Sequence, residues 1–148
     1  MHVANPWKSY RQIATQTAPP GQLVLMLYEG ILRYLERSLP GFTCPDPAQA
    51  NMLIHNNLQR AQEIVRELSL ALDLEKGGQF AHTLRRLYDY FDRRLTESNL
   101  RKNRQGVDEV IRHVTILRDA WATMLNNQAA DNQATPPPSE SSGALATA

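Results

Sequence analysis

Helix-breaking residues divide the chain into four long segments. Prolines and glycines gather at 19–21, 40–47 and 77–78, and a polar turn stands at 103–106. Between these breaks apolar residues recur every three or four positions, the spacing of one side of an α-helix. The sequence therefore predicts helices over 20–39, 47–72, 79–100 and 107–126, with Asp46 as the cap of the second.

Each predicted helix carries one broad apolar stripe that it cannot leave in water. The stripes are Leu23, Val24, Leu27, Tyr28, Ile31, Leu32 and Leu35; Ile54, Leu58, Ala61, Val65, Leu68 and Leu72; Phe80, Leu84, Leu87, Phe91 and Leu95, with Tyr88 beside them; and Val107, Val110, Ile111, Val114, Leu117, Trp121 and Leu125. Short connections make neighbouring helices antiparallel, and no strand pattern is present. The predicted fold is all-α, an antiparallel up-down four-helix bundle with a short N-terminal helical segment.

The two ends of the chain differ from the bundle at 19–126. Residues 1–18 form an N-terminal cap segment in which Trp7, Tyr10 and Ile13 share one apolar side at helical spacing. So short a helix is unstable alone, so it either docks on the bundle or frays. Residues 127–148 are rich in Gln, Asn, Ala and Ser, which predicts a disordered tail.

Composition narrows the possible locations and partners. The net charge is only +1, too small for a general nucleic-acid binder. The single cysteine, Cys44, cannot form a disulfide within the chain. Neither a signal peptide nor an apolar run long enough to span a membrane is present, so we expect a cytoplasmic protein without membrane insertion.

The polar residues do not suggest an enzyme. None of the four histidines follows a glutamate at the spacing that di-metal bundles use, and the Gly77-Gly78 pair lacks the strand of a phosphate-binding loop. We expect no metal, no cofactor and no catalytic residue. Asp89 stands four residues from both Arg85 and Arg93, which predicts surface ion pairs.

A basic segment keeps one alternative open. Residues 85–104 contain seven Lys or Arg and three acids, a local excess of +4. Such a stripe could neutralise phosphates, although the acids on the same helix partly cancel its field. The alternative function is a dimeric regulatory or structural bundle, for which these arginines offer a nucleic-acid-binding surface.

More apolar residues are present than one stripe per helix requires. Leu25, Met26 and Leu27 are consecutive, and Tyr88 and Tyr90 lie on different sides of their helix. Exposed apolar residues of this kind favour a partner-binding surface. A broad core or a homodimer face is the alternative explanation.

Several short motifs resemble those of the flagellin export chaperones, the FliS family. They are the run 72–81, Leu87-Tyr88-Asp89-Tyr90, Arg93-Arg94-Leu95, Ser98-Asn99-Leu100 and, upstream, Met26-Leu27-Tyr28-Glu29-Gly30. Together with weaker matches they extend the resemblance over about residues 10–121.

The resemblance implies a cytoplasmic, non-catalytic bundle. It would bind the disordered C-terminal segment of flagellin, prevent premature polymerisation and present flagellin to a component of the export gate. The residues expected to bind partners are Trp7, Tyr10, Ile13, Met26, Leu87, Tyr90, Arg94 and Leu100. A permanently docked N-terminal turn, and core or ion-pair roles for Leu87, Tyr90 and Arg94, remain the alternatives.

Overall fold

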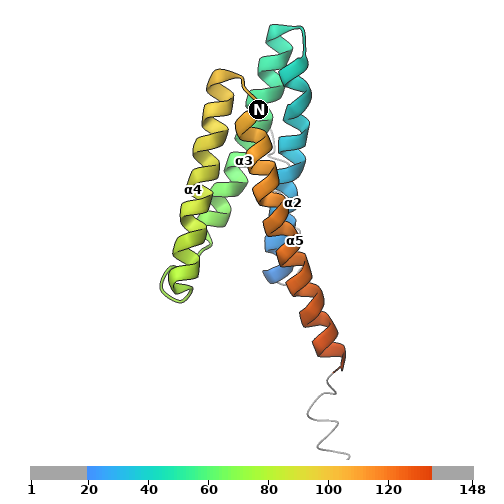
Figure 1. The fold of residues 1–148 in the computed structure, drawn as a ribbon, viewed down its shortest axis with the longest axis vertical. Coiled ribbons are helices and arrows are strands. Elements are labelled where there is room, and N and C mark those ends of the chain that lie inside the picture. The colour runs from blue at the N-terminus through green and yellow to red at the C-terminus, as the bar shows by residue number, and fades with distance from the viewer. Residues whose placement is uncertain (1–19, 135–148) are drawn as a thin grey trace, which may run out of the picture.

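Four long helices run alternately up and down the molecule. The computed structural model describes residues 20–134, in which α2 spans Pro20–Ser38, α3 Pro47–Leu70, α4 Gly78–Arg101 and α5 Gln105–Ala134. A short 3-10 helix, η1, spans Leu39–Thr43 between α2 and α3. Helices α2 and α4 each pack against both α3 and α5 (Figure 1). The predicted all-α antiparallel bundle is confirmed.

Local chemistry sets the helix ends close to where the sequence placed them. The Asp46 side chain accepts a hydrogen bond from the Ala48 amide, and Pro47 opens α3. Gly78 opens α4 with φ +56, in the left-handed region that glycine adopts without strain. The Asn103 side chain accepts from the Gln105 amide at the start of α5. These contacts satisfy backbone groups that a helix end leaves unpaired.

The core follows the predicted stripes, with its clearest departures in α4. Leu84, Phe91 and Leu95 are buried as predicted, whereas Phe80 is 68% exposed. Phe80 lies in the first turn of α4, where that helix stands away from α5 (Figure 1). Its place in the stripe is correct, but no neighbouring helix covers it. Leu87, also predicted in the core, is only half-buried.

Tyr88, predicted to lie beside the stripe, is in fact a central core residue. It is buried against α2, and its hydroxyl shares a 2.7 Å hydrogen bond with that of Tyr28. Burial raises the pKa of both tyrosines above the usual value. The pair therefore joins the diagonal helices α2 and α4 through two neutral hydroxyls.

The last helix is longer than predicted. Helix α5 continues to Ala134, eight residues past the predicted end at Asn126. The segment 127–134 contains alanines and no proline or glycine, so its polar composition does not oppose a helix. The predictions for residues 1–18 and for the rest of the tail lie outside the described residues. No helix among those described has the length and apolarity needed to cross a membrane.

Candidate partner-binding site

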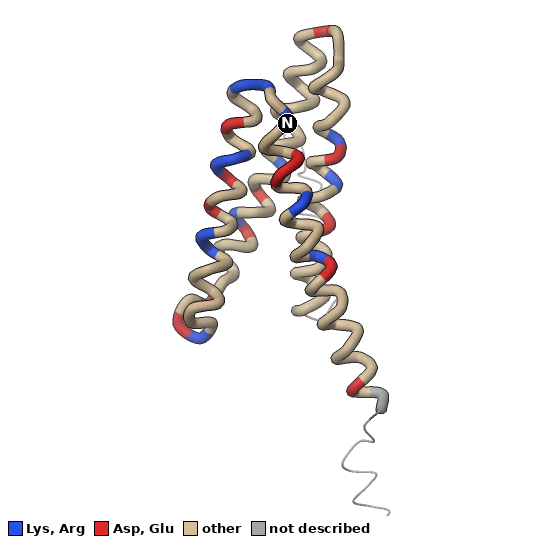
Figure 2. Tube along the Cα trace, viewed as in Figure 1, with Lys and Arg blue, Asp and Glu red and all other residues tan. Residues whose placement is uncertain are grey.

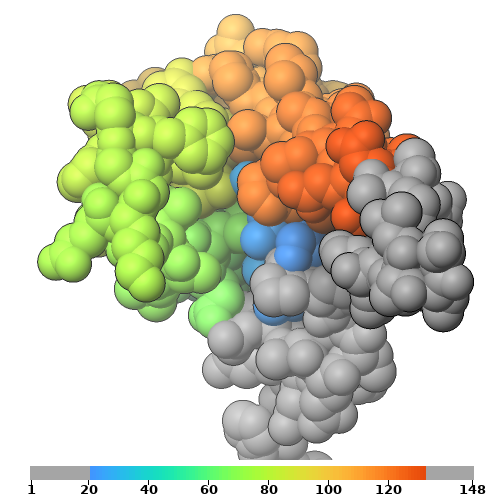
Figure 3. All heavy atoms as spheres, turned by 90° about the horizontal axis from the view of Figure 1, so that it is seen from below, coloured from blue at the N-terminus to red at the C-terminus, as the bar shows by residue number. Residues whose placement is uncertain are grey.

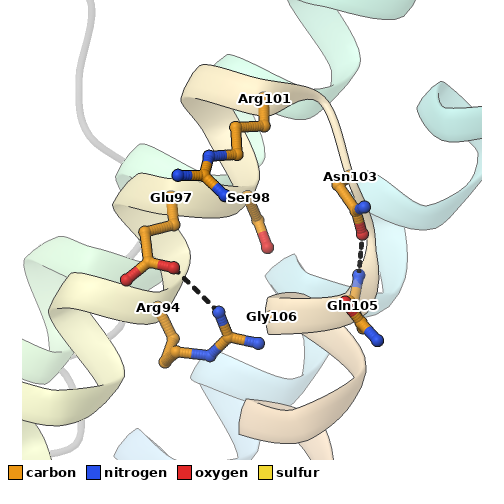
Figure 4. Close-up of a pocket in the computed structure, with 7 residues that line it drawn as sticks. All are labelled: Arg94, Glu97, Ser98, Arg101, Asn103, Gln105 and Gly106. Atoms are coloured by element: carbon orange, nitrogen blue, oxygen red, sulfur yellow. Dashed lines mark hydrogen bonds and ion pairs between the residues drawn. The ribbon is translucent and has the colours of Figure 1, made fainter.

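A polar cluster joins α4 to α5 in their upper halves. The Tyr90 hydroxyl donates to Oε1 of Glu109, and Nε of Arg94 donates to Oε2 of the same carboxylate at 2.9 Å. Nη1 of Arg94 also pairs with Glu97 at 2.9 Å (Figure 4). We call Tyr90, Arg94 and Glu109 the clasp.

The clasp has a clear electrostatic character. The hydrogen bond from the Tyr90 hydroxyl to the Glu109 carboxylate raises the pKa of Tyr90. The same bond, together with the positive charge of Arg94, lowers the pKa of Glu109. Glu109 therefore stays ionised at neutral pH. The side chains of Arg94 and Glu109 are each about one-fifth exposed, so water screens this pair only in part.

Below the clasp, α4 and α5 diverge (Figure 1), and apolar residues continue the side of each helix that carries the clasp. Phe80 and Leu87 stand at seven-residue intervals before Arg94, so they share its side of α4. Ile116 stands seven residues after Glu109, on the same side of α5, and Met124 follows two turns later. The ring contact of Phe91 with His113 sets the register between the helices.

That register places Leu87 level with Leu117, and Phe80 level with Met124. We call the surface formed by Phe80, Leu87, Ile116, Leu117 and Met124 the α4–α5 groove. From below, the first turns of α2 are visible between α4 and α5 (Figure 3). Leu87 and Leu117 are half-buried against the core, which makes them the floor of the groove.

The walls of the groove are unusually exposed. Phe80, Ile116 and Met124 are 68%, 66% and 38% exposed. The structure describes six large hydrophobic residues that are exposed to this extent. Helical spacing and the register of α4 against α5 assign three of the six to this surface. A concentration of apolar side chains in one place is typical of a surface that binds another protein.

Comparison with known proteins identifies the family. The family model described as "Flagellar protein FliS" matches residues 3–128. The chain belongs to this family. The resemblance inferred from the sequence motifs is thereby confirmed.

Curated relatives from several bacteria bear the same description, flagellar secretion chaperone FliS. The protein of Bacillus subtilis is 32% identical over 131 residues, which cover 88% of this chain and 94% of the relative. That of Salmonella typhimurium is 34% identical over 126 residues, covering 82% and 90%. That of Campylobacter jejuni is 34% identical over 122 residues, covering 82% and 92%.

Only some of the predicted partner-binding residues lie close to one another in the structure. Leu87 lies in the groove, while Tyr90 and Arg94 belong to the clasp that closes it. Met26 is half-buried on α2, roughly half a turn round that helix from the core residue Leu35. Leu100 is 79% exposed near the end of α4, away from the groove. Trp7, Tyr10 and Ile13 lie outside the described residues.

Sequence reasoning missed the contribution of α5. Glu109 was not recognised as the partner of Tyr90 and Arg94, because they are separated by 19 and 15 positions. Ile116 and Met124 lie off the predicted stripe of their helix. That departure from the stripe was the available signal, the same surplus of apolar residues that pointed to a partner surface on the other helices.

The predicted ion pairs of Asp89 are wrong. Among the ion pairs of residues 20–134, none joins Asp89 to Arg85 or Arg93. Arg93 instead lies over the ring of Tyr90, with its guanidinium carbon 5.8 Å from the ring centroid. Asp89 and Arg85 line a separate pocket of about 240 Å³ between α3 and α4, beside Tyr88. Asp89 and Arg85 are both exposed, so water competes effectively with an ion pair between them.

The arginines of α4 do not form a continuous basic face. Acidic and basic residues alternate along the helix (Figure 2). Arg94 is bound by two carboxylates, those of Glu97 and Glu109, and Arg104, just after α4, pairs with Asp108 at 3.0 Å. Within the part of the chain that is described, no group of three or more His, Cys, Asp or Glu could hold a metal ion. The apolar α4–α5 groove is therefore the candidate binding surface.

Proposed function

We propose that this chain is a cytoplasmic, non-enzymatic chaperone that binds the C-terminal segment of flagellin. By covering that segment it prevents flagellin from polymerising before export, and it presents flagellin to the flagellar type III secretion apparatus, including a component of the export gate. Its relatives in Bacillus subtilis and Salmonella typhimurium are described as flagellar secretion chaperones, which supports this proposal.

The α4–α5 groove carries the proposal. An amphipathic helix binds such a groove by laying its apolar side between two helices of the receptor. Phe80, Ile116 and Met124 are positioned to cover that side from both walls, and Leu87 supports it from below. Ordering a disordered segment costs several kcal/mol of the gross interaction energy, so a long interface is needed.

The other predicted binding residues fit a segment that continues past the groove. Met26 on α2 and Leu100 near the end of α4 are too far round the bundle to contact a helix in the groove. A partner that wraps the bundle would reach them with its flanking residues. We therefore keep both as proposed contacts, secondary to those of the groove.

The experiment compares two single substitutions in exposed apolar residues. Ile116→Asp places a charge in the groove, and Met52→Asp places the same charge on an equally exposed residue of α3, 61% against 66%. Neither side chain supports the core, so both variants should melt as the parent does. Calorimetry with flagellin of the same organism should show binding at least roughly tenfold weaker for Ile116→Asp only.

The same samples test the homodimer alternative. Sedimentation analysis gives the oligomeric state of the parent and of both variants. If Ile116→Asp turns a dimer into a monomer while flagellin binding stays unchanged, the groove is a dimer interface and the proposal is wrong. Equal loss of binding in both variants would also contradict it.

A further inference from the structure

Three arginines surround the closed end of the groove without an ion pair. Arg86 and Arg93 are exposed on α4, and Arg112 is exposed on α5. None of them takes part in an ion pair among the described residues. The nearby carboxylates of Glu97 and Glu109 are both bound by Arg94.

Their positions place these charges on both walls. Arg86 precedes Tyr90 by one helical turn and donates to the Thr83 hydroxyl on the same side of α4. Arg93 lies over the Tyr90 ring, on the outer side of the clasp. Arg112 precedes Ile116 by one turn, so it stands directly above the exposed wall of the groove.

The acids near the groove do not balance them. Asp119 is one turn below Ile116, but it pairs with Arg118 at 3.0 Å. Asp89 lines the pocket between α3 and α4 together with Arg66 and Arg85, away from the groove. Arg94 balances only one of Glu97 and Glu109, so one carboxylate offsets one of the three arginines, and the closed end of the groove keeps a net positive charge beside an apolar floor.

We infer that the segment bound in the α4–α5 groove is an amphipathic helix with acidic side chains flanking its apolar side at the end next to the clasp. This inference rests on the proposed function and adds the chemistry by which the groove selects its partner. Complementary charge at the rim of an interface mainly fixes register and speeds association. An apolar groove alone would accept the helix in several positions, whereas the arginines favour one.

The test reverses charge at the groove and at a matched control surface. Arg86→Glu with Arg112→Glu alters the groove rim, and Arg66→Glu with Arg85→Glu makes the same change in net charge on the rim of the α3–α4 pocket. All four side chains are exposed, and circular dichroism melts check that both proteins fold. Binding of intact flagellin is measured by calorimetry at about 50 and about 500 mM salt.

We expect the groove variant to bind flagellin roughly tenfold more weakly at low salt, and to lose most of the salt dependence of the parent. The control should change affinity by less than about threefold. Replacing acidic residues of the flagellin segment with glutamine should reproduce the effect of the groove variant.

The outcomes separate the two claims. If the parent binds flagellin and the two variants bind equally well, the charge selection is wrong and the proposed function stands. If the parent binds intact flagellin no better than flagellin without its C-terminal segment, the proposed function fails and this inference fails with it.

Discussion

Glu109 of α5 accepts hydrogen bonds from both Tyr90 and Arg94 of α4, and so holds together two helices that separate toward the start of α4 (Figure 1). Each carboxylate oxygen has its own donor on the other helix. The upper limit of the α4–α5 groove is therefore set by one acidic residue. Replacing it should alter both the stability of the bundle and the shape of its candidate binding surface.

The first prediction concerns the acid stability of the clasp. Because the pKa of Glu109 is lower in the folded protein, its ionised form stabilises the fold above the unfolded pKa of about 4.3. That stabilisation is lost as pH falls below about 4.3, through the folded pKa. In the parent, the free energy of unfolding measured with denaturant between about pH 2 and pH 7 should fall at the acidic end of this range. Glu109→Gln should show a smaller loss, and identical pH profiles would contradict this account.

The second prediction concerns the buried tyrosine pair. Tyr28→Phe removes one hydroxyl and leaves that of Tyr88 buried without its partner, at a cost of about 1–3 kcal/mol in the free energy of unfolding. Tyr28→Phe with Tyr88→Phe leaves no unpaired hydroxyl, so the double variant should lose less than the sum of the single variants. Additive losses in chemical unfolding would show that the two hydroxyls do not depend on each other.

The third prediction concerns the close contact between the end of α4 and the start of α5. A Cβ on Gly106 would lie 2.4 Å from Oγ of Ser98 and 2.6 Å from the backbone oxygen of Arg94. Figure 4 shows Ser98 directed toward Gly106. Because a backbone atom cannot move aside cheaply, Gly106→Ala should destabilise the protein by about 1–3 kcal/mol.

The neighbouring residue supplies the control for this substitution. Gln105 is exposed and also lies in the first turn of α5, so Gln105→Ala should leave the melting temperature almost unchanged. If the Gly106→Ala and Gln105→Ala variants have the same melting temperature, the two helices are not in the close contact described.

Helix existence and most of the core follow from sequence because they depend on local pattern. Leu84, Phe91 and Leu95 are buried as their spacing predicts, and Asp46 caps α3 as its position before Pro47 predicts. The sequence prediction ends α5 eight residues too early, because polar composition suggests disorder, whereas the alanines of this segment favour helix.

The groove could not be predicted because it depends on where two helices separate. Phe80 has the spacing of a core residue, and only the divergence of α5 leaves it exposed. The pairing of Glu109 with Tyr90 and Arg94 likewise depends on the register between α4 and α5. Periodicity within one helix carries no information about either relationship.

The most direct test of the central claim measures the heat of binding to two forms of flagellin. The chain is titrated with flagellin of the same organism, first intact and then without its C-terminal segment. The account predicts tight binding of the intact protein and no measurable binding of the truncated one. Equal binding of both forms, or none to either, would contradict it.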